Sequence, residues 1–297
     1  MKSKFGQYGP MDDEYVCALR NNCLGMPNLQ VWRGMAQSKG KIDYSKDFYY
    51  IDTGYFNGFD GTKHKEWHRI TKNNYQTLGH YGVDVLHNDS YCMNKFRKIF
   101  TVGYDKFKPG LLLQGVAAKG RKWKTKPWKK RYADGENILI IEPSLKVFQH
   151  YGIDSKEWTK GVIEELKKYT DRKVIFRSKP NRQERMSTNT LDDQLRRDEI
   201  FCTITFASVA GLHSVMAGVP SIVLGPSASD YLSNKKISDI ENPYYPDDDK
   251  IKNHLLYLAN CQFNIEEIQN GKAWHYINEL QGENKYEANK GLVFTGE

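Results

Sequence analysis

The chain has no long apolar run and few cysteines, and both shortages narrow the class of protein. No stretch of about 18 apolar residues occurs, so we expect no membrane-spanning segment. The first residues carry no apolar signal core, which predicts a cytoplasmic protein. The five cysteines are scattered and form no CxxC pair, which argues against a disulfide framework or a zinc site.

Positive charge is in excess. The chain has 44 Lys and Arg against 36 Asp and Glu, a net charge of +8, which favours a polyanionic partner. Residues 119–131 hold eight cations and two tryptophans, a combination suited to DNA phosphates and unpaired bases. The alternative is a solvated linker whose tryptophans pack between domains. The candidate DNA-contact residues are Lys119, Arg121, Lys122, Trp123, Lys124, Lys126, Trp128, Lys129, Lys130 and Arg131.

The second half of the sequence alternates buried strands with helices. This pattern predicts an α/β fold with a parallel sheet and helices on both faces. The expected strands are 138–142, 173–177, 200–204 and 220–224, and the expected helices are 154–169, 190–197, 208–217, 250–260 and 264–280. The last helix is announced by Asn264 and Glu267, a capping-box pair.

The first half has a weaker pattern. Candidate strands are 48–52 and 98–102, a helix is expected from Met11, and residues 53–95 look like long functional loops. We therefore expect a first domain at 1–135, a second domain at 136–280, and a tail at 281–297 that crosses back to the first domain.

Two strand ends in the second half suit a diphosphate. Arg177 and Lys179 follow strand 173–177, where paired cations would stabilise a leaving group that gains negative charge. Ser208 and the N–H group of Val209 follow strand 200–204, where a turn opens a helix. The alternatives are a solvated surface pair for the two cations and a plain helix cap for Ser208.

The first domain offers a base for removing a proton from an acceptor hydroxyl. Asp52 at a strand end is the leading candidate, with His64 and His68 behind it. Asp52 can instead cap the turn at Gly54, and the histidines can be surface or substrate-contact residues. Glu241 can bind ribose or sugar hydroxyls, or stabilise its own turn. The acidic run 247–249 reads as a helix start, and we expect no required metal.

Several of these residues resemble the GT-B glycosyltransferase superfamily. Ser208 and Gly218-Val219-Pro220 match the turn and the exit of its nucleotide domain. In that superfamily an acidic residue five positions before the glycine typically grips the ribose; this chain departs from the pattern with His213, which can still hydrogen-bond there. A closer likeness, to glycosyltransferase-like proteins of bacteriophages, runs through 50–56, 68–73, 172–180, 240–243 and 262–274.

This resemblance implies two Rossmann-like domains that face each other across a cleft. It implies a GT-B-type transferase whose donor is a nucleotide diphosphate sugar, such as UDP-linked glucose or arabinose, with no cofactor. The implied acceptor is a hydroxymethylated pyrimidine, such as hydroxymethylcytosine, in double-stranded phage DNA in the host cytoplasm. The alternatives are an enzyme acting on a cell-surface glycan or lipid-linked saccharide, and a non-catalytic DNA-binding protein on the same scaffold.

Overall fold

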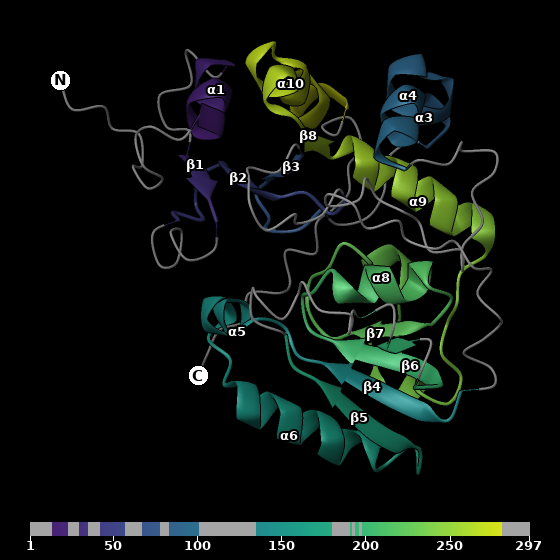
Figure 1. The fold of residues 1–297 in the computed structure, drawn as a ribbon. Helices are drawn as coiled ribbons and strands as arrows, with labels where there is room; N and C mark the ends of the chain where they lie inside the picture. The colour runs from purple at the N-terminus through teal and green to yellow at the C-terminus, as the bar shows by residue number, and fades with distance from the viewer. Residues whose placement is uncertain are drawn as a thin grey trace.

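Two four-stranded sheets, each with its own helices, form the described part of the chain (Figure 1). The computed structural model describes residues 14–22, 30–34, 42–56, 67–77, 83–100, 135–179, 191, 194–195 and 198–280. Within these ranges no helix has both the length and the apolar character needed to cross a lipid bilayer. The structure is of the α/β class, as the sequence predicts.

The first sheet has the order β1-β2-β3-β8. Strand β1 runs parallel to β2, whereas β3 is antiparallel to both β2 and β8. The strands are β1 (Gln30–Arg33), β2 (Phe48–Thr53), β3 (His68–Lys72) and β8 (Gln262–Phe263). Its helices are α1 (Glu14–Asn22), α3 (Val83–Asn88), α4 (Ser90–Ile99), α9 (Asp248–Asn260), α10 (Ile265–Gln269) and α11 (Lys272–His275), followed by a π-helical turn (Tyr276–Leu280).

Alternation along β2 divides the first sheet into two different faces. Tyr49 and Ile51 point into the core beneath the helices, whereas Phe48 and Tyr50 join a second apolar cluster that includes Trp32. Figure 1 shows α1, α4 and α10 on the side of this sheet away from the second sheet. The face that carries Tyr50 is therefore the one turned toward the rest of the molecule.

Two predictions for the first half are wrong. The sequence predicts a strand at 98–102, but helix α4 runs through Ile99 because Asp89 caps its start and Cys92, Phe96 and Ile99 are buried at helical spacing. The sequence also predicts loops over 53–95, where the structure has β3, α3 and most of α4. Strand β3 escapes detection because it buries polar residues instead of an apolar run.

The second sheet confirms the pattern read from the sequence. All its strands are parallel, in the order β5-β4-β6-β7. The strands are β4 (Asn137–Ile141), β5 (Lys173–Arg177), β6 (Ile200–Thr205) and β7 (Ser221–Val223), and the helices are α5 (Leu145–Tyr151), α6 (Ser155–Leu166) and α8 (Ala210–Met216). Val162 of α6 packs in the cluster of Ile140 on one face, whereas Ala210 of α8 packs against the cluster of Leu139 on the other. Helices therefore cover both faces.

The chain returns to the first sheet after the second is complete. Helix α9 packs against α3 and α4, and β8 pairs with β3 so that Arg69 lies opposite Gln262. Asn264 and Glu267 then form the predicted capping box at the start of α10. The sequence predicts that the tail 281–297 crosses back to the first half, but these residues lie outside the described ranges. Helix α9, which precedes them in the chain, packs against the first half.

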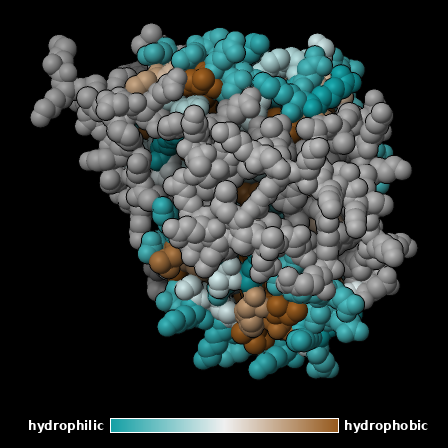
Figure 2. All heavy atoms as spheres, in the orientation of Figure 1, coloured by the Kyte–Doolittle hydropathy of each residue, from teal (hydrophilic) through white to brown (hydrophobic). Residues whose placement is uncertain are grey.

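On the face shown in Figure 2, the described surface is largely hydrophilic, and its apolar patches are small and separate. Large apolar side chains that are exposed are scattered over both halves: Tyr44, Tyr91, Leu145, Tyr169, Phe176 and Tyr244. Scattered apolar residues are normal for a soluble surface and do not mark a docking face.

A buried ion pair holds the returning segment in place. Lys95 Nζ of α4 lies 3.1 Å from Glu267 Oε2 of α10, and the two side chains are only 2% and 9% exposed. The hydroxyl of Tyr91 donates to the other carboxylate oxygen. Burial lowers the pKa of Lys95 to about 7, while the carboxylate beside it opposes that loss of charge. The rings of Trp67 and Phe263 face the ammonium group.

Replacing Lys95 should weaken the whole fold. Lys95→Met leaves the Glu267 carboxylate buried without its cation, so we expect the free energy of unfolding to fall by about 3–5 kcal/mol. Urea denaturation followed by tryptophan fluorescence measures the change. Arg97→Met on the exposed side of the same helix is the control and should stay within about 0.5 kcal/mol of the parent. Equal losses in both variants would contradict the role of the buried pair.

Candidate functional site

The two halves of the molecule meet along a polar seam. Gln76, in the loop after β3, donates from Nε2 to the carbonyl oxygen of Ala207 at 3.4 Å. The ring of Tyr75 lies 4.0 Å from the ring of His150 at the end of α5. We use "the seam" for the residues that face each other here. Those of the first half are Tyr44, Tyr50, Asp52, Arg69, Tyr75 and Gln76, and those of the second are His150, Tyr151, Ala207, Ser208 and Asp230.

The seam lies at the topological switch point of the second sheet. From β4 the chain crosses to β5 on one side and then to β6 on the other. In open parallel sheets, ligands bind outside the carboxyl ends of the two strands at such a point. Here these are β4 and β6, and Thr205 Oγ1 donates to the carbonyl oxygen of Ile141 at 2.7 Å to join their ends.

The turn after β6 is under strain and is held from several sides. Ala207 has φ +44°, a left-handed conformation that is unfavourable for a residue with a Cβ. Ser227 Oγ donates to the carbonyl oxygen of Ser208 at 3.1 Å, and Ser208 Oγ accepts from the N–H group of Ala210 at 3.2 Å. The predicted residues Ser208 and Val209 therefore lie at the switch point, and the Ser208 hydroxyl acts as a cap.

The predicted cations lie on the same edge of the sheet, beyond β4. Arg177 at the end of β5 donates from Nη1 to Gln194 Oε1 at 2.7 Å, and Lys179 is exposed. Strand β4 separates them from the turn at Ser208, because β5 is the outer strand. The structure thus brings Arg177, Lys179 and Ser208 to one edge but not into mutual contact.

Glu241 lies at the opposite edge of the sheet. Its carboxylate accepts from Arg172 Nε at 3.0 and 3.1 Å, and Arg172 also donates to the carbonyl oxygen of Gly135 at 2.9 Å. The hydrogen bond from Arg172 lowers the pKa of Glu241. Gly135 and Arg172 precede β4 and β5, so Glu241 stabilises the amino edge, away from Arg177 and Ser208. His213 is half-buried within α8.

Asp52 projects from β2 into the seam. Its Oδ2 accepts from the Tyr50 hydroxyl and from Arg69 Nη2, both at 3.0 Å, and its Oδ1 accepts from the N–H group of Thr53 at 2.7 Å. The Asp52 side chain is 29% exposed. A fixed carboxylate that remains partly open to solvent can accept a hydrogen bond from a substrate hydroxyl.

His68, one of the two histidines predicted as alternatives to Asp52, does not lie beside it. His68 pairs with Thr53 in the register of the sheet, so its side chain points to the helix-covered face, whereas Arg69 shares the face of Asp52. There His68 Nε2 lies 3.2 Å from Arg33 Nη2, and its ring packs on Tyr15. His64 and the whole basic segment 119–131 lie outside the described ranges.

Arg69 and Tyr151 belong to the site, although the sequence did not mark them. Burial raises the pKa of Tyr151 to about 12; the charges of Tyr44 and Asp230 add to this rise, and that of Arg69 opposes it. The Tyr151 hydroxyl therefore lies among groups from both halves of the molecule. Nothing in the sequence separates it from the other tyrosines, of which the chain has 19 in all.

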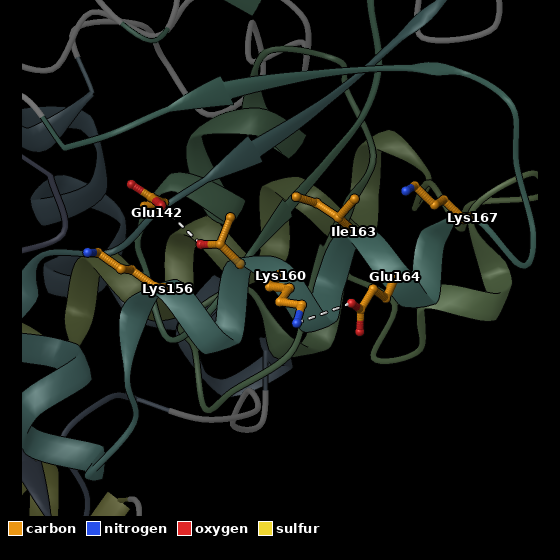
Figure 3. Close-up of a pocket in the computed structure, with 7 residues that line it drawn as sticks. Glu142, Lys156, Lys160, Ile163, Glu164 and Lys167 are labelled. Atoms are coloured by element: carbon orange, nitrogen blue, oxygen red, sulfur yellow. Dashed lines mark hydrogen bonds and ion pairs between the residues drawn. The ribbon is translucent and has the colours of Figure 1, made fainter.

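A separate depression of about 390 Å³ follows one side of α6 (Figure 3). Its lining is mainly charged: Glu142, Lys156, Thr159, Lys160, Ile163, Glu164 and Lys167. Figure 3 shows Lys160 beside Glu164, at 3.7 Å, and Glu142 accepting a hydrogen bond from Thr159. Lys156, Lys160, Glu164 and Lys167 are all exposed, so the depression fits a solvated helix surface better than a ligand site. Elsewhere in the described ranges, no group of three or more His, Cys, Asp or Glu is placed to hold a metal.

Comparisons with known proteins give no family assignment. No protein-family model matches the chain, and no curated protein matches it. Two solved structures that match are KpsC enzymes of Thermosulfurimonas dismutans. The beta Kdo 2,4 transferase has 12% identity over 77% of this chain and 78% of that chain, with a TM-score of 0.39. The beta Kdo 2,7 transferase has 10% identity over 86% and 89%, with a TM-score of 0.43. Similarity at this level does not establish a common family or activity.

The turn at the switch point depends on a glycine. A Cβ on Gly225 would lie 2.6 Å from the Phe206 ring, which is itself buried against Tyr151 and Trp158. We expect Gly225→Ala to displace the turn and to cost about 1–3 kcal/mol of stability, measured by thermal unfolding. Gly161→Ala in α6 meets no atom within 4 Å and should instead stabilise by about 0.5–1 kcal/mol. Stabilisation by both substitutions would show that Phe206 has room to move.

Proposed function

We propose that this chain is a glycosyltransferase that joins a nucleotide-activated sugar to a saccharide acceptor at the seam. One observation carries the proposal: the switch point of the parallel sheet, where a nucleotide ligand is expected, lies against the first half, where Gln76 donates to Ala207 and Arg69, the ion-pair partner of Asp52, interacts with Tyr151. A donor bound to one half would thereby meet an acceptor bound to the other. Proximity of this kind supplies a large part of the rate enhancement in group transfer.

The donor half of the proposal rests on the carboxyl edge of the second sheet. We propose a nucleotide diphosphate sugar, UDP-linked, with its diphosphate near Ser208 and the cations Arg177 and Lys179. Negative charge that develops on the leaving diphosphate is stabilised by cations and N–H groups already in place. The proposed reaction needs no metal and no further cofactor.

The acceptor half rests on Asp52. The carboxylate takes the proton from an acceptor hydroxyl while that oxygen attacks the anomeric carbon. The bond from the anomeric carbon to the diphosphate breaks, and its electron pair leaves with the nucleotide diphosphate. The reaction therefore exchanges one glycosidic bond for another, and the proton remains on Asp52 until solvent removes it.

The charge of the seam favours a saccharide over DNA as acceptor. Arg69 is paired with Asp52, and Lys235 is paired with Asp230. A DNA backbone requires several cations free to neutralise phosphates, whereas sugar hydroxyls are bound by carboxylates and tyrosines such as those of the seam.

A DNA acceptor is the second candidate, and the observation that favours it is the distribution of charge along the sequence. The net charge is +8, and eight of the cations lie within 119–131 together with Trp123 and Trp128. If that segment binds DNA, hydroxymethylated pyrimidines would be the acceptors. A DNA-binding protein without transferase activity would share this charge but would have no affinity for a nucleotide sugar.

One experiment separates these functions. The protein is incubated with a mixture of UDP-sugars and either a panel of saccharides or hydroxymethylcytosine DNA, and products are identified by mass spectrometry. We expect a hexose or pentose mass gain on a saccharide, reduced by about 10²–10⁴-fold in Asp52→Asn. Asp171→Asn, an exposed carboxylate at the amino edge of the second sheet, is the control and should retain the parental rate.

Three other results of this experiment would change the proposed function. A mass gain on DNA alone moves the acceptor assignment to the second candidate. Salt-sensitive DNA binding without binding of any UDP-sugar identifies the non-catalytic protein. A transfer rate that is unchanged in Asp52→Asn removes Asp52 from the reaction.

A further inference from the structure

Arg69 joins the ends of two adjacent strands. From β3 its Nη2 donates to Asp52 Oδ2 at 3.0 Å, and its Nη1 donates to the carbonyl oxygen of Thr53 at 2.8 Å. The guanidinium lies 5.2 Å from the centroid of the Tyr55 ring. The Arg69 side chain is 8% exposed, against 29% for Asp52. The cation is thus buried behind the carboxylate, and the carboxylate faces outward.

Three donors fix the orientation of this carboxylate. Tyr50 and Arg69 both donate to Oδ2, while the N–H group of Thr53 donates to Oδ1. The Tyr50 side chain is fully buried and cannot swing away. Asp52 therefore cannot rotate about its terminal bond without losing hydrogen bonds from three residues.

The arrangement is poorly suited to stability alone. Burying a guanidinium costs several kcal/mol, and an apolar pair of similar volume often serves stability as well or better. Arg69 Nε is buried and has no hydrogen-bond partner in the described part of the chain. The two terminal nitrogens, in contrast, are directed at Asp52 and at the peptide that follows it. The side chain is placed to hold Asp52.

We propose that Arg69 and Tyr50 are positioning residues that hold the Asp52 carboxylate ionised and aimed at the acceptor hydroxyl. This inference rests on the proposed glycosyl transfer. Neither residue is a catalytic group, because each acts through Asp52. A general base must be within hydrogen-bond reach of the proton it removes, and an error of about 1 Å costs roughly 10²-fold in rate.

The test is steady-state transfer together with donor binding. For Arg69→Met we expect kcat to fall about 10²-fold with the Kd for UDP-sugar unchanged within about twofold, because the donor is held by the other half. Arg69→Lys should restore part of the rate, since it returns the charge but not both hydrogen bonds. Tyr50→Phe removes one of the three donors, should fold normally, and should give a smaller loss.

A matched control is available in the second half. Arg172 forms a similar ion pair with Glu241 at the amino edge of the sheet, away from the seam. Arg172→Met should lower the free energy of unfolding while leaving kcat of the folded enzyme unchanged. Tyr169→Phe, at an exposed hydroxyl bonded to Glu165, is the equivalent control for Tyr50→Phe.

The pH profile distinguishes positioning from simple structural support. Among the described residues, the titratable groups that interact with Arg69 besides Asp52 are Tyr50 and Tyr55 from the first half and Tyr151 across the seam, and Asp230 in turn interacts with Tyr151. Removing Arg69 takes away the charge that favours the ionised carboxylate, so the acidic limb of the rate profile should move to higher pH.

Three results would overturn the inference. Rates within about threefold of the parent in both Arg69→Met and Tyr50→Phe would make the pair purely structural. Donor affinity that falls by the same factor as kcat would place Arg69 in contact with the donor. A parent protein that transfers sugar to no acceptor removes the proposed function, and the inference with it.

Discussion

The buried pair of Lys95 and Glu267 is the interaction on which the candidate site depends, because it closes the first half over a return of 172 residues. Glu267 also accepts the N–H group of Asn264 at 2.9 Å, which fixes the end of β8. Gln262, the first residue of β8, lies opposite Arg69 in the sheet, and its side chain accepts from the N–H group of Phe56 at 3.2 Å. A continuous path of contacts therefore runs from the buried ion pair to the arginine that holds Asp52.

The second sheet was predictable because β4, β6 and β7 are buried on both sides and all four strands form short apolar runs in the sequence. The first sheet was not, because β3 is the sequence His-Arg-Ile-Thr-Lys, in which His68, Arg69 and Lys72 have their partners far along the chain, at Arg33, Asp52 and Asp47. Asp52 could be named as a candidate because it lies at the end of a strand that the sequence predicts. Its partner Arg69 was missed because cross-strand register is non-local, and a shift of one residue exchanges the two faces of a sheet. His68 shows this directly, since it lies one position from Arg69 and points the other way.

The edge of the second sheet at which Glu241 lies could not be predicted from the sequence. Parallel strands have two edges, and a residue in a long connection can reach either of them. The segment 240–243 follows the last strand of the second sheet, where a ligand contact was a reasonable expectation. Arg172 fixes the position of Glu241, because it lies just before β5 and forms an ion pair with Glu241 there. The Arg172 guanidinium lies 3.7 Å from the centroid of the Phe201 ring. The ion pair with Arg172, and not the sequence around Glu241, therefore determines at which edge of the second sheet Glu241 lies.

Two ion pairs of the first half, Lys95 with Glu267 and Arg69 with Asp52, both bury their cations but differ in the exposure of their carboxylates. In one, Lys95 and Glu267 are both withdrawn from solvent, and every oxygen of the carboxylate is occupied by Lys95, Tyr91 or Asn264. In the other, Arg69 is withdrawn but Asp52 keeps more than a quarter of its side chain exposed. A pair that served only to join β2 and β3 would gain from full burial of both partners with all their groups satisfied. The Asp52 and Arg69 pair differs from this arrangement, because the Asp52 side chain is 29% exposed while Arg69 is 8% exposed, and the proposed role of Asp52 rests on this difference.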